Sequence, residues 1–567
     1  MIRTVVGLLA LWAGVQAAPT RRDTSSPVVQ VKNGTYAGAT NTNYNQDLFL
    51  GIPYAQQPVG NLRLTVPQSL NETWDGERDA KAYSDSCVGY GTDSIWYSMS
   101  EACLTLNVIR DSSVDEDSKL PVGVWIHGGG FYQGSGADER YNMSAIVSNA
   151  HRIGKPFIAV TINYRLSAWG FLSSHEVTES GNTNLGLRDQ RLALHWIREN
   201  IASFGGDPDK VTIWGESAGG MSVGYHLIAY GGRDDHLFRG GILESGGPIS
   251  ASPLVDGSSY QDDFDALVKE VGCEGSGKGA LQCLREVPFE ELNGALNGTG
   301  GDPVYWFLPV IDEDFIRKRG SLSLGAHEFV QVPVIAGTNS DEGTSFGPTG
   351  INTTEHFYTY LTGNQSDPPL PSPIAHNLLT LYPDDPSQGI PAYLGDTRIA
   401  SKGLQWRRTN AYTGDYMMHA NRRRQCSAWA ETSTPAYCYR FNVRSADVSY
   451  TSGSAHFEEV AFVFNNIAGL GYHDGKPFTA ETPESWVRLS EMMASMWAGF
   501  IYELDPNAVG SHSGDFVRWD GYGDGNGNEV DILFDADANA TTSRMEGDTW
   551  RKDAIEYINS IADVYER

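Results

Sequence analysis

Runs of mainly apolar, often β-branched residues recur along the chain, and longer polar or glycine-containing stretches separate them. The clearest runs span residues 121–126, 156–162, 211–214, 332–336 and 437–443. Runs without polar alternation are typical of strands that are covered on both faces, as in a parallel sheet. We therefore predict buried, mostly parallel strands at these places.

Between the second and third runs the spacing becomes helical, with Leu187, Leu194, Ile197 and Ile201 on one face. The pattern stops before Gly205-Gly206, and glycine commonly ends a helix. This helix would cross from one strand to the next with its apolar face packed in the core. Strands that alternate with helices predict an α/β fold.

The third run leads directly into Gly215-Glu216-Ser217-Ala218-Gly219. A G-x-S-x-G pattern after a strand is typical of a serine on a sharp strand-to-helix turn, with its hydroxyl exposed. Flanking glycines are needed because the turn leaves no room for a Cβ beside the serine. In a chain this rich in glycine the pattern needs support from its surroundings.

That support comes from His127-Gly128-Gly129-Gly130-Phe131, which follows the run 121–126. Such a glycine loop supplies backbone N–H groups to the oxyanion hole of lipases and esterases. Donors that are fixed in advance stabilise the charge that develops during acyl transfer. An ordinary glycine turn is the alternative for the loop alone, but the pairing with the serine turn favours the catalytic interpretation.

A nucleophilic serine needs an acid and a base, in the order serine, acid, histidine for this type of fold. Glu342 follows the run 332–336 in a glycine-bounded turn, at the end of a strand where α/β sheets place their sites. His456 lies in a loop after the run 437–443. The residues alone leave both choices open, since Asp341 competes with Glu342. The histidines that compete with His456 are His127, His226 and His473.

Taken together, these segments resemble the type-B carboxylesterase/lipase family of α/β-hydrolases, which includes fungal lipases, carboxylesterases and cholinesterases. Further matching stretches lie in family order at 49–55, 58–63, 101–107, 184–190, 200–208, 244–246 and 307–312. The resemblance runs from about residue 28 to the C-terminus. It implies an α/β-hydrolase fold, with a mostly parallel central sheet, flanking helices and large insertions.

The resemblance also implies roles for individual residues. Ser217 would be the nucleophile, His456 the general base and then acid, and Glu342 the carboxylate that orients the imidazole. The implied oxyanion donors are the backbone N–H groups of Gly129, Gly130 and Ala218. Glu216 and Ser245 match family positions beside this triad. An ester would be cleaved through an acyl-enzyme on the serine.

For the substrate pocket, the resemblance points to Phe131, Trp96 and Tyr305, with Tyr305 in the acyl wall. In lipases of the family, the loop closed by the first disulfide is a long hydrophobic lid. The corresponding loop here is short, which favours an open carboxylesterase pocket over a triacylglycerol lipase. The family also contains adhesion proteins without activity, but this chain keeps all three residues of the triad.

The first residues predict secretion. Arg3 precedes an apolar stretch at 5–15, and Val15-Gln16-Ala17 fits a cleavage site, so residues 1–17 are expected to be a signal peptide. The stretch is too short for a membrane span. Residues 18–27 would form a short tail, trimmed at Arg21-Arg22 or simply exposed. Residues 28–567 would form one domain, since no repeat, linker or charge block marks a boundary.

Cysteines and sequons agree with an extracellular location. Together with proximity along the chain, the resemblance favours Cys87–Cys103 and Cys273–Cys283, and leaves Cys426 with Cys438. N-x-S/T sequons, which predict glycosylation, occur at Asn33, Asn71, Asn142, Asn297, Asn352, Asn364 and Asn539.

The net charge of −29 argues against nucleic acid and anionic membranes as partners. Residues 524–528 resemble part of a calcium loop, but Glu529 stands where such a loop requires glycine. The cysteines and histidines lack the spacing of a zinc site. We therefore expect no metal and no cofactor, and a small-molecule or lipid ester as the partner, with no stable membrane anchor.

Overall fold

The computed structural model describes residues 26–366, 368–473, 475–509, 516–523 and 528–567. The expected signal peptide, residues 1–17, lies outside the described residues, as do residues 18–25 of the expected tail. The same holds for residues 524–527 of the stretch that resembles a calcium loop.

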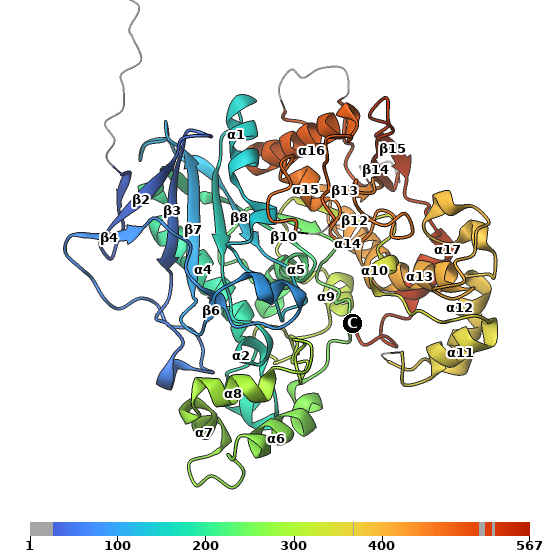
Figure 1. Ribbon diagram of the computed structural model, residues 1–567, viewed down its shortest axis with the longest axis horizontal. Helices are drawn as coiled ribbons and strands as arrows, with labels where there is room; N and C mark the ends of the chain where they lie inside the picture. Colours follow the sequence, from blue (N-terminus) through green and yellow to red (C-terminus); the bar gives the residue numbers. More distant parts are fainter. Residues whose placement is uncertain (1–25, 367, 474, 510–515, 524–527) are drawn as a thin grey trace, which may run out of the picture.

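A 13-stranded sheet, counted over the described residues, forms the centre of the fold (Figure 1). Its parallel strands are, in spatial order, β9 (Ile158–Ile162), β8 (Leu120–Ile126), β10 (Gly206–Glu216), β11 (Gly240–Glu244), β12 (Val334–Asn339), β13 (Ala436–Phe441) and β14 (Val530–Phe534). The strands predicted from the apolar runs are all present, so the prediction of a mostly parallel sheet is confirmed.

Mainly antiparallel strands complete the two edges of this sheet. Beside β9 lie β7 (Thr105–Asp111), β3 (Gln46–Pro53), β2 (Thr35–Asn41) and β1 (Val28–Gln30). A short strand, β4 (Glu77–Ala80), pairs in parallel with β2. The opposite edge ends with β15 (Arg544–Gly547), antiparallel to β14.

The central strands divide their side chains between two hydrophobic layers. In β8, Val124 and Ile126 face one layer and Trp125 faces the other, as the two-residue period of a strand requires. Helices α4 (Leu185–Asn200) and α5 (Ala218–Gly232) cover the first face. Helices α1 (Ser144–Arg152) and α16 (Glu484–Glu503) cover the second. The predicted crossover helix is therefore confirmed as α4, which packs Leu187, Leu194 and Ile197 into the first layer.

Long insertions follow the carboxyl ends of β11 and β12. The first contains α6 (Gln261–Glu270), α7 (Ala280–Glu286), α8 (Phe289–Leu296) and α9 (Gly320–Gly325). The second contains α10 (Gly343–Phe346), α11 (Thr354–Thr362), α12 (Ser372–Leu381), α13 (Trp406–Gly414) and α14 (Ala420–Glu431). With α17 (Lys552–Ser560), helices of the second insertion enclose a third hydrophobic cluster. Figure 1 shows α6–α8 and α11–α13 as separate groups beside the sheet.

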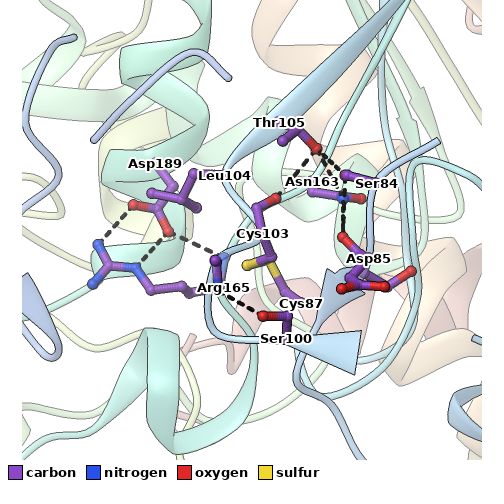
Figure 2. The surroundings of a disulfide bond; sticks show 12 residues. Ser84, Asp85, Cys87, Ser100, Cys103, Leu104, Thr105, Asn163, Arg165 and Asp189 are labelled. Carbon is purple, nitrogen blue, oxygen red and sulfur yellow. Dashed lines mark hydrogen bonds and ion pairs between the residues drawn. A yellow bond between two sulfur atoms is a disulfide. The ribbon is translucent and has the colours of Figure 1, made fainter. Parts of the chain in front are cut away.

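All six cysteines form disulfides: Cys87–Cys103 and Cys273–Cys283, as the resemblance and proximity favour, and Cys426–Cys438, the pair that these leave. Figure 2 shows the first pair between two groups of hydrogen-bonded polar residues. On one side, Arg165 pairs with Asp189 at 2.7 Å. On the other, the Asn163 amide donates to the Asp85 carbonyl oxygen at 3.3 Å. The disulfide that closes the short loop between Cys87 and Cys103 is therefore flanked by hydrogen-bonded residues on both sides.

Candidate active site

Ser217 lies on the turn between β10 and α5, at the carboxyl end of a central strand. Its backbone angles, φ 56° and ψ −124°, are strained for a residue with a side chain. The Ser217 N–H donates to the carbonyl oxygen of Glu244 on β11 at 2.9 Å, which holds the turn. The half-buried side chain lines a cavity, so the turn presents a hydroxyl at the cavity wall, as the G-x-S-x-G pattern predicts.

The glycines that flank Ser217 are required by the close approach of main chains. A Cβ on Gly219 would overlap the carbonyl oxygen of Ile126 at the end of β8. A Cβ on Gly215 would in turn overlap the backbone of Gly219. Backbone atoms cannot move aside as a flexible side chain can, so any other residue at these two positions would force the turn open.

Glu342 and His456 meet from two loops at the same edge of the sheet. Glu342 lies between β12 and α10, and His456 lies in the loop after β13. Glu342 Oε2 is 2.7 Å from Nδ1 of His456. Its other oxygen accepts hydrogen bonds from Ser245 Oγ at 2.5 Å and from the Asn339 N–H at 2.8 Å. Because both oxygens of this buried carboxylate are bound, the imidazole is held in one orientation.

The competing candidates lie elsewhere. Asp341 accepts a hydrogen bond from the Ser454 N–H at 2.8 Å, so it fixes the loop that leads to His456 and does not contact the imidazole. The other candidate histidines are held by contacts of their own: His127 by a backbone carbonyl, His226 by a glutamine side chain and His473 by a stacked tryptophan ring. His456, in contrast, lines the cavity together with Ser217.

A second carboxylate faces the His456 imidazole. The buried Glu216 places Oε1 3.2 Å from Nε2 of His456. Burial disfavours the charged imidazole, but the carboxylates of Glu216 and Glu342 outweigh burial and raise the pKa of His456 to about 9. Burial in turn raises the pKa of Glu216 to about 7. Ser217 Oγ has no hydrogen-bond partner among the described residues, so in this state His456 is hydrogen-bonded to Glu342 and lies within ion-pair distance of Glu216.

Two further glutamates are buried nearby. Glu244 accepts hydrogen bonds from the indole N–H groups of Trp214 at 2.8 Å and Trp497 at 2.5 Å. Glu459 accepts from the Asn339 amide at 2.5 Å. Burial raises the pKa of Glu244 to about 8 and raises that of Glu459 well above its usual range. Both raised pKa values have the same cause, since burial disfavours the charged form of a carboxyl group.

The glycine loop after β8 lines the same cavity. Gly129 and Gly130 have φ values of 97° and 61°, in the left-handed region that favours glycine. Within the described part of the chain, no hydrogen bond leaves the N–H of either residue. Ala218 is the first residue of α5, where an N–H has no acceptor inside the helix. Free N–H groups beside a nucleophile can bind an oxyanion as it forms.

The cavity has a volume of about 410 Å³ and a largely apolar wall. Its apolar lining includes Phe131, Tyr141, Met221, Trp306, Leu308, Phe346, Met417, Met418 and Phe457. Asp93 and Arg140 add a polar side, joined by an ion pair of 2.5 Å. A concave apolar cavity with a few placed polar groups suits a small, mainly apolar ligand.

Of the three residues expected at the substrate pocket, one lines the cavity and two lie outside its lining. Phe131 lines the cavity and is buried. Trp96 stacks on His473 at 3.7 Å and borders a neighbouring hollow instead. Tyr305 is also outside the cavity lining, because its hydroxyl donates to Glu270 on α6 at 3.2 Å. The next residue, Trp306, takes the place expected for Tyr305 in the wall.

Several cavity residues were not anticipated from the sequence. Phe346 packs edge-on against the His456 ring, with 4.8 Å between ring centroids. Met417 and Met418 reach the cavity from the segment between α13 and α14. Phe346 lies only a few residues after Glu342 in the sequence, so its position near the motif could have marked it as a residue of the cavity wall. The methionines lie in an insertion that carries no motif, so no pattern in the sequence points to them.

Within the described part of the chain, no helix is both long and apolar enough to cross a bilayer. The same residues contain no group of three or more His, Cys, Asp or Glu side chains that could hold a metal ion.

Comparisons with known proteins identify the family of this chain. Residues 25–550 match the Carboxylesterase family. Secreted lipase 1 of Botryotinia fuckeliana is 34% identical, over 96% of this chain and 93% of that protein. Secreted triacylglycerol lipase LIP1 of Gibberella zeae is 30% identical, over 96% and 92%.

Among solved structures, EstA of Aspergillus niger superimposes with a TM-score of 0.80 at 26% identity, and the match covers 96% of this chain and 99% of that one. The long family match, the relatives and the shared fold lead to one conclusion: the chain belongs to the Carboxylesterase family and is a carboxylic ester hydrolase with the α/β-hydrolase fold.

Proposed function

We propose that the protein cleaves carboxylic esters through an acyl-enzyme on Ser217, with His456 as base and acid and Glu342 as the orienting carboxylate. The observation that carries this proposal is the 2.7 Å contact between Glu342 and His456, beside a cavity into which the strained Ser217 turn also opens. Three elements far apart in the sequence converge there, as a nucleophile, a base and an orienting acid must.

In the proposed reaction, His456 Nε2 takes the proton of Ser217 Oγ as the oxygen attacks the ester carbonyl. The N–H groups of Gly129, Gly130 and Ala218 stabilise the oxyanion. His456 then donates its proton to the departing alcohol, and water repeats the sequence to release the acid. Glu342 keeps a proton on Nδ1 and stabilises the charged imidazole.

For His456 to act as a base, its Nε2 must be unprotonated and must turn from Glu216 toward Ser217. In the state described here, Nε2 faces Glu216 at 3.2 Å. Catalytic hydrogen bonds are often long before substrate binds and tighten in the complex. We therefore assign the present arrangement to the resting enzyme.

For the substrate, the apolar wall around Met221 and Leu308 favours an acyl chain of moderate length on a soluble ester. A triacylglycerol lipase is the second candidate. It is favoured by Ile95 and Trp96, which are 74% and 53% exposed on the short loop closed by the first disulfide. The name of the Gibberella zeae relative points the same way.

We further propose that the protein is secreted and glycosylated. Two relatives bear the word secreted in their names. Most of the sequon asparagines are exposed: Asn71, Asn297, Asn352, Asn364 and Asn539. Asn33 and Asn142 are half-buried. A glycosidase that lowers the mass of the secreted protein would support occupancy, and an unchanged mass would contradict it.

The test of the proposed function is hydrolysis of p-nitrophenyl esters of increasing acyl length, dissolved and emulsified, with Ser217→Ala as the control. Activity on short dissolved esters that disappears in Ser217→Ala would support a serine carboxylesterase. A preference for long emulsified esters would favour the lipase. Full activity in Ser217→Ala would refute the proposed nucleophile.

A further inference from the structure

Helices α13 and α14 are joined by a π turn, Asp415–His419, which places two adjacent methionines at the cavity. The Ala420 N–H bonds to the carbonyl oxygen of Asp415, five residues earlier. Such turns are rare and occur often at functional sites. Here the turn carries Met417 and Met418, so its position decides where one wall of the cavity stands.

The start of this turn is fixed by a buried ion pair. Asp415 accepts two hydrogen bonds from the guanidinium of Arg551, both at 2.6 Å. The Tyr382 hydroxyl adds a third at 2.7 Å. These contacts hold the first residue of the turn, but they do not reach the residues that carry the methionines.

The middle of the turn is held by Arg567, whose side chain is only 2% exposed. Its Nη1 donates to the carbonyl oxygen of Tyr416, the residue before Met417. The guanidinium also lies over the rings of Tyr416 and Tyr565, at 5.4 and 4.7 Å from their centroids. No carboxylate of the described residues forms an ion pair with Arg567. The contacts with the Tyr416 carbonyl oxygen and with the rings of Tyr416 and Tyr565 therefore compensate the burial of this charge.

The same short segment also binds a second part of the cavity lining, which the Asn421 amide on α14 joins directly by donating to the Ser250 carbonyl oxygen at 3.4 Å. Residues 250–253 line the cavity, and the next residue, Leu254, donates its N–H to the carbonyl oxygen of Glu566 at 2.7 Å. Ser321 on α9 donates to the carbonyl oxygen of Arg567. Figure 1 places the end of the chain beside α9, between the second insertion and the sheet.

We propose that residues 565–567, the strap, set the spacing between the wall of Met417 and Met418 and the wall of residues 250–253, and so determine which acyl chains the enzyme accepts. Arg567 is the positioning residue, because its side chain holds one wall while its neighbour Glu566 holds the other. The inference rests on the proposed ester hydrolysis at Ser217 and adds a determinant of its substrate range.

A short and a long acyl group respond differently to this spacing. An acetyl group carries only a methyl beyond the carbonyl that Ser217 attacks, so it makes few contacts with the cavity lining. An octanoyl group must pack between the two walls to gain binding energy that is realised in the transition state. When the strap is weakened, the walls lose their fixed spacing and the long chain loses contacts.

The test compares kcat/KM for p-nitrophenyl octanoate and acetate in Arg567→Met, which keeps the bulk of the side chain and removes its N–H donors and charge. We expect the octanoate-to-acetate ratio to fall about tenfold, since small misplacements of binding groups cost that much or more. The loss should appear in KM as well as in kcat. Arg567→Lys keeps a donor and a charge, and should restore most of the ratio.

Arg407 provides a matched control. It is equally buried and donates to backbone carbonyls, those of Gly395 at 2.6 Å and Pro391 at 2.7 Å. These contacts touch neither cavity wall. Arg407→Met should lower the melting temperature and leave the octanoate-to-acetate ratio unchanged. Ser321→Ala, which removes only the hydroxyl that holds the Arg567 carbonyl, is a milder variant and decides the question if Arg567→Met does not fold.

Three results together would support the proposed role of the strap in acyl-chain selection. The octanoate-to-acetate ratio should fall in Arg567→Met and Ser321→Ala, return in Arg567→Lys, and stay unchanged in Arg407→Met. A ratio equal to that of the wild type in Arg567→Met, or in Ser321→Ala if the former does not fold, would overturn it while leaving the proposed function intact. Wild-type protein that hydrolyses neither ester would instead overturn the proposed function, and with it the premise of the strap.

Discussion

Glu216 faces the nitrogen of His456 that has to accept the serine proton, and replacing Glu216 by glutamine tests what this contact does. The Glu216 Oε1 atom is 3.2 Å from His456 Nε2, and Glu342 Oε2 is 2.7 Å from Nδ1. The Glu216→Gln variant keeps the size of the side chain and removes one of the two charges that favour the imidazolium. We expect the pKa of His456 to fall from its raised value of about 9.

The size of the shift can be bounded from the geometry. At this separation and an effective dielectric constant of about 20, two unit charges attract by about 5 kcal/mol. Close opposite charges shift a pKa by about 1 to 3 units in practice. Burial raises the pKa of Glu216 itself to about 7, so Glu216 is only partly ionised near neutral pH. We therefore expect the lower end of the range, about one unit.

The assay is kcat/KM for a soluble p-nitrophenyl ester as a function of pH. Neutral His456 is the active base, so activity rises with pH through its pKa, and a lower pKa moves this rise to lower pH. The acid limb of Glu216→Gln should lie about one pH unit below that of the wild type. A change in stability alone would scale the whole profile without moving it.

Glu458 supplies the matched control. Burial raises the pKa of its carboxyl group to about 7, as for Glu216, but Glu458 accepts its hydrogen bond from the Ser445 N–H at 3.0 Å and does not contact the imidazole. Glu458→Gln should leave the acid limb in place. An acid limb that does not move in Glu216→Gln, or that moves to higher pH, would refute the electrostatic reasoning.

Three further predictions concern the support of the site and the stability of the fold. Ser245→Ala removes the hydroxyl that donates to Glu342 at 2.5 Å, and steady-state kinetics should show kcat lowered about tenfold with little change in KM; an unchanged kcat would mean that this bond does not orient the acid. Replacing both residues of Cys426–Cys438 by alanine should lower the free energy of unfolding by about 2–4 kcal/mol in urea denaturation, and a loss below measurement error would contradict the expectation. Arg422→Met breaks a buried ion pair with Asp548 of 2.8 Å and should cost about 3–5 kcal/mol in the same assay, whereas a neutral or stabilising effect would show that desolvation outweighs the pair.

The sheet and its crossover helix were predictable from the sequence because their patterns are local. Residues 156–160 and 332–336 are apolar without interruption, and such runs are typical of strands covered on both faces. The strand that ends at Glu216 begins well before its apolar run: Gly206 pairs with Leu120 of β8, and the register is then irregular until Val211. No side-chain pattern marks such a start.

The site was predictable to the extent that motifs and the family resemblance mark it. The choice of Glu342 over Asp341 depends on which carboxylate reaches the imidazole, and two adjacent residues at a strand end point to different sides. The same reason explains the exchange of Tyr305 for Trp306 in the cavity wall. In an irregular segment, an error of one position in the expected alignment changes which side chain faces the cavity.

Neither the π turn nor the strap could be predicted from the sequence. Arg567 is more than a hundred residues from the Tyr416 carbonyl that it binds, and no spacing rule connects them. A buried arginine without a carboxylate partner looks like an exposed residue in the sequence, because burial of its charge is compensated by ring faces and a carbonyl. Such contacts emerge only when the third hydrophobic cluster is assembled.

The measurement that tests the central claim most directly is covalent labelling with a fluorophosphonate, which reacts with an activated serine, followed by mass spectrometry of the peptides. We predict a single adduct on Ser217, formed rapidly in the wild type and very slowly in His456→Ala and Glu342→Ala. An adduct on another serine, or equal labelling rates in the wild type and His456→Ala, would contradict the account of this active site.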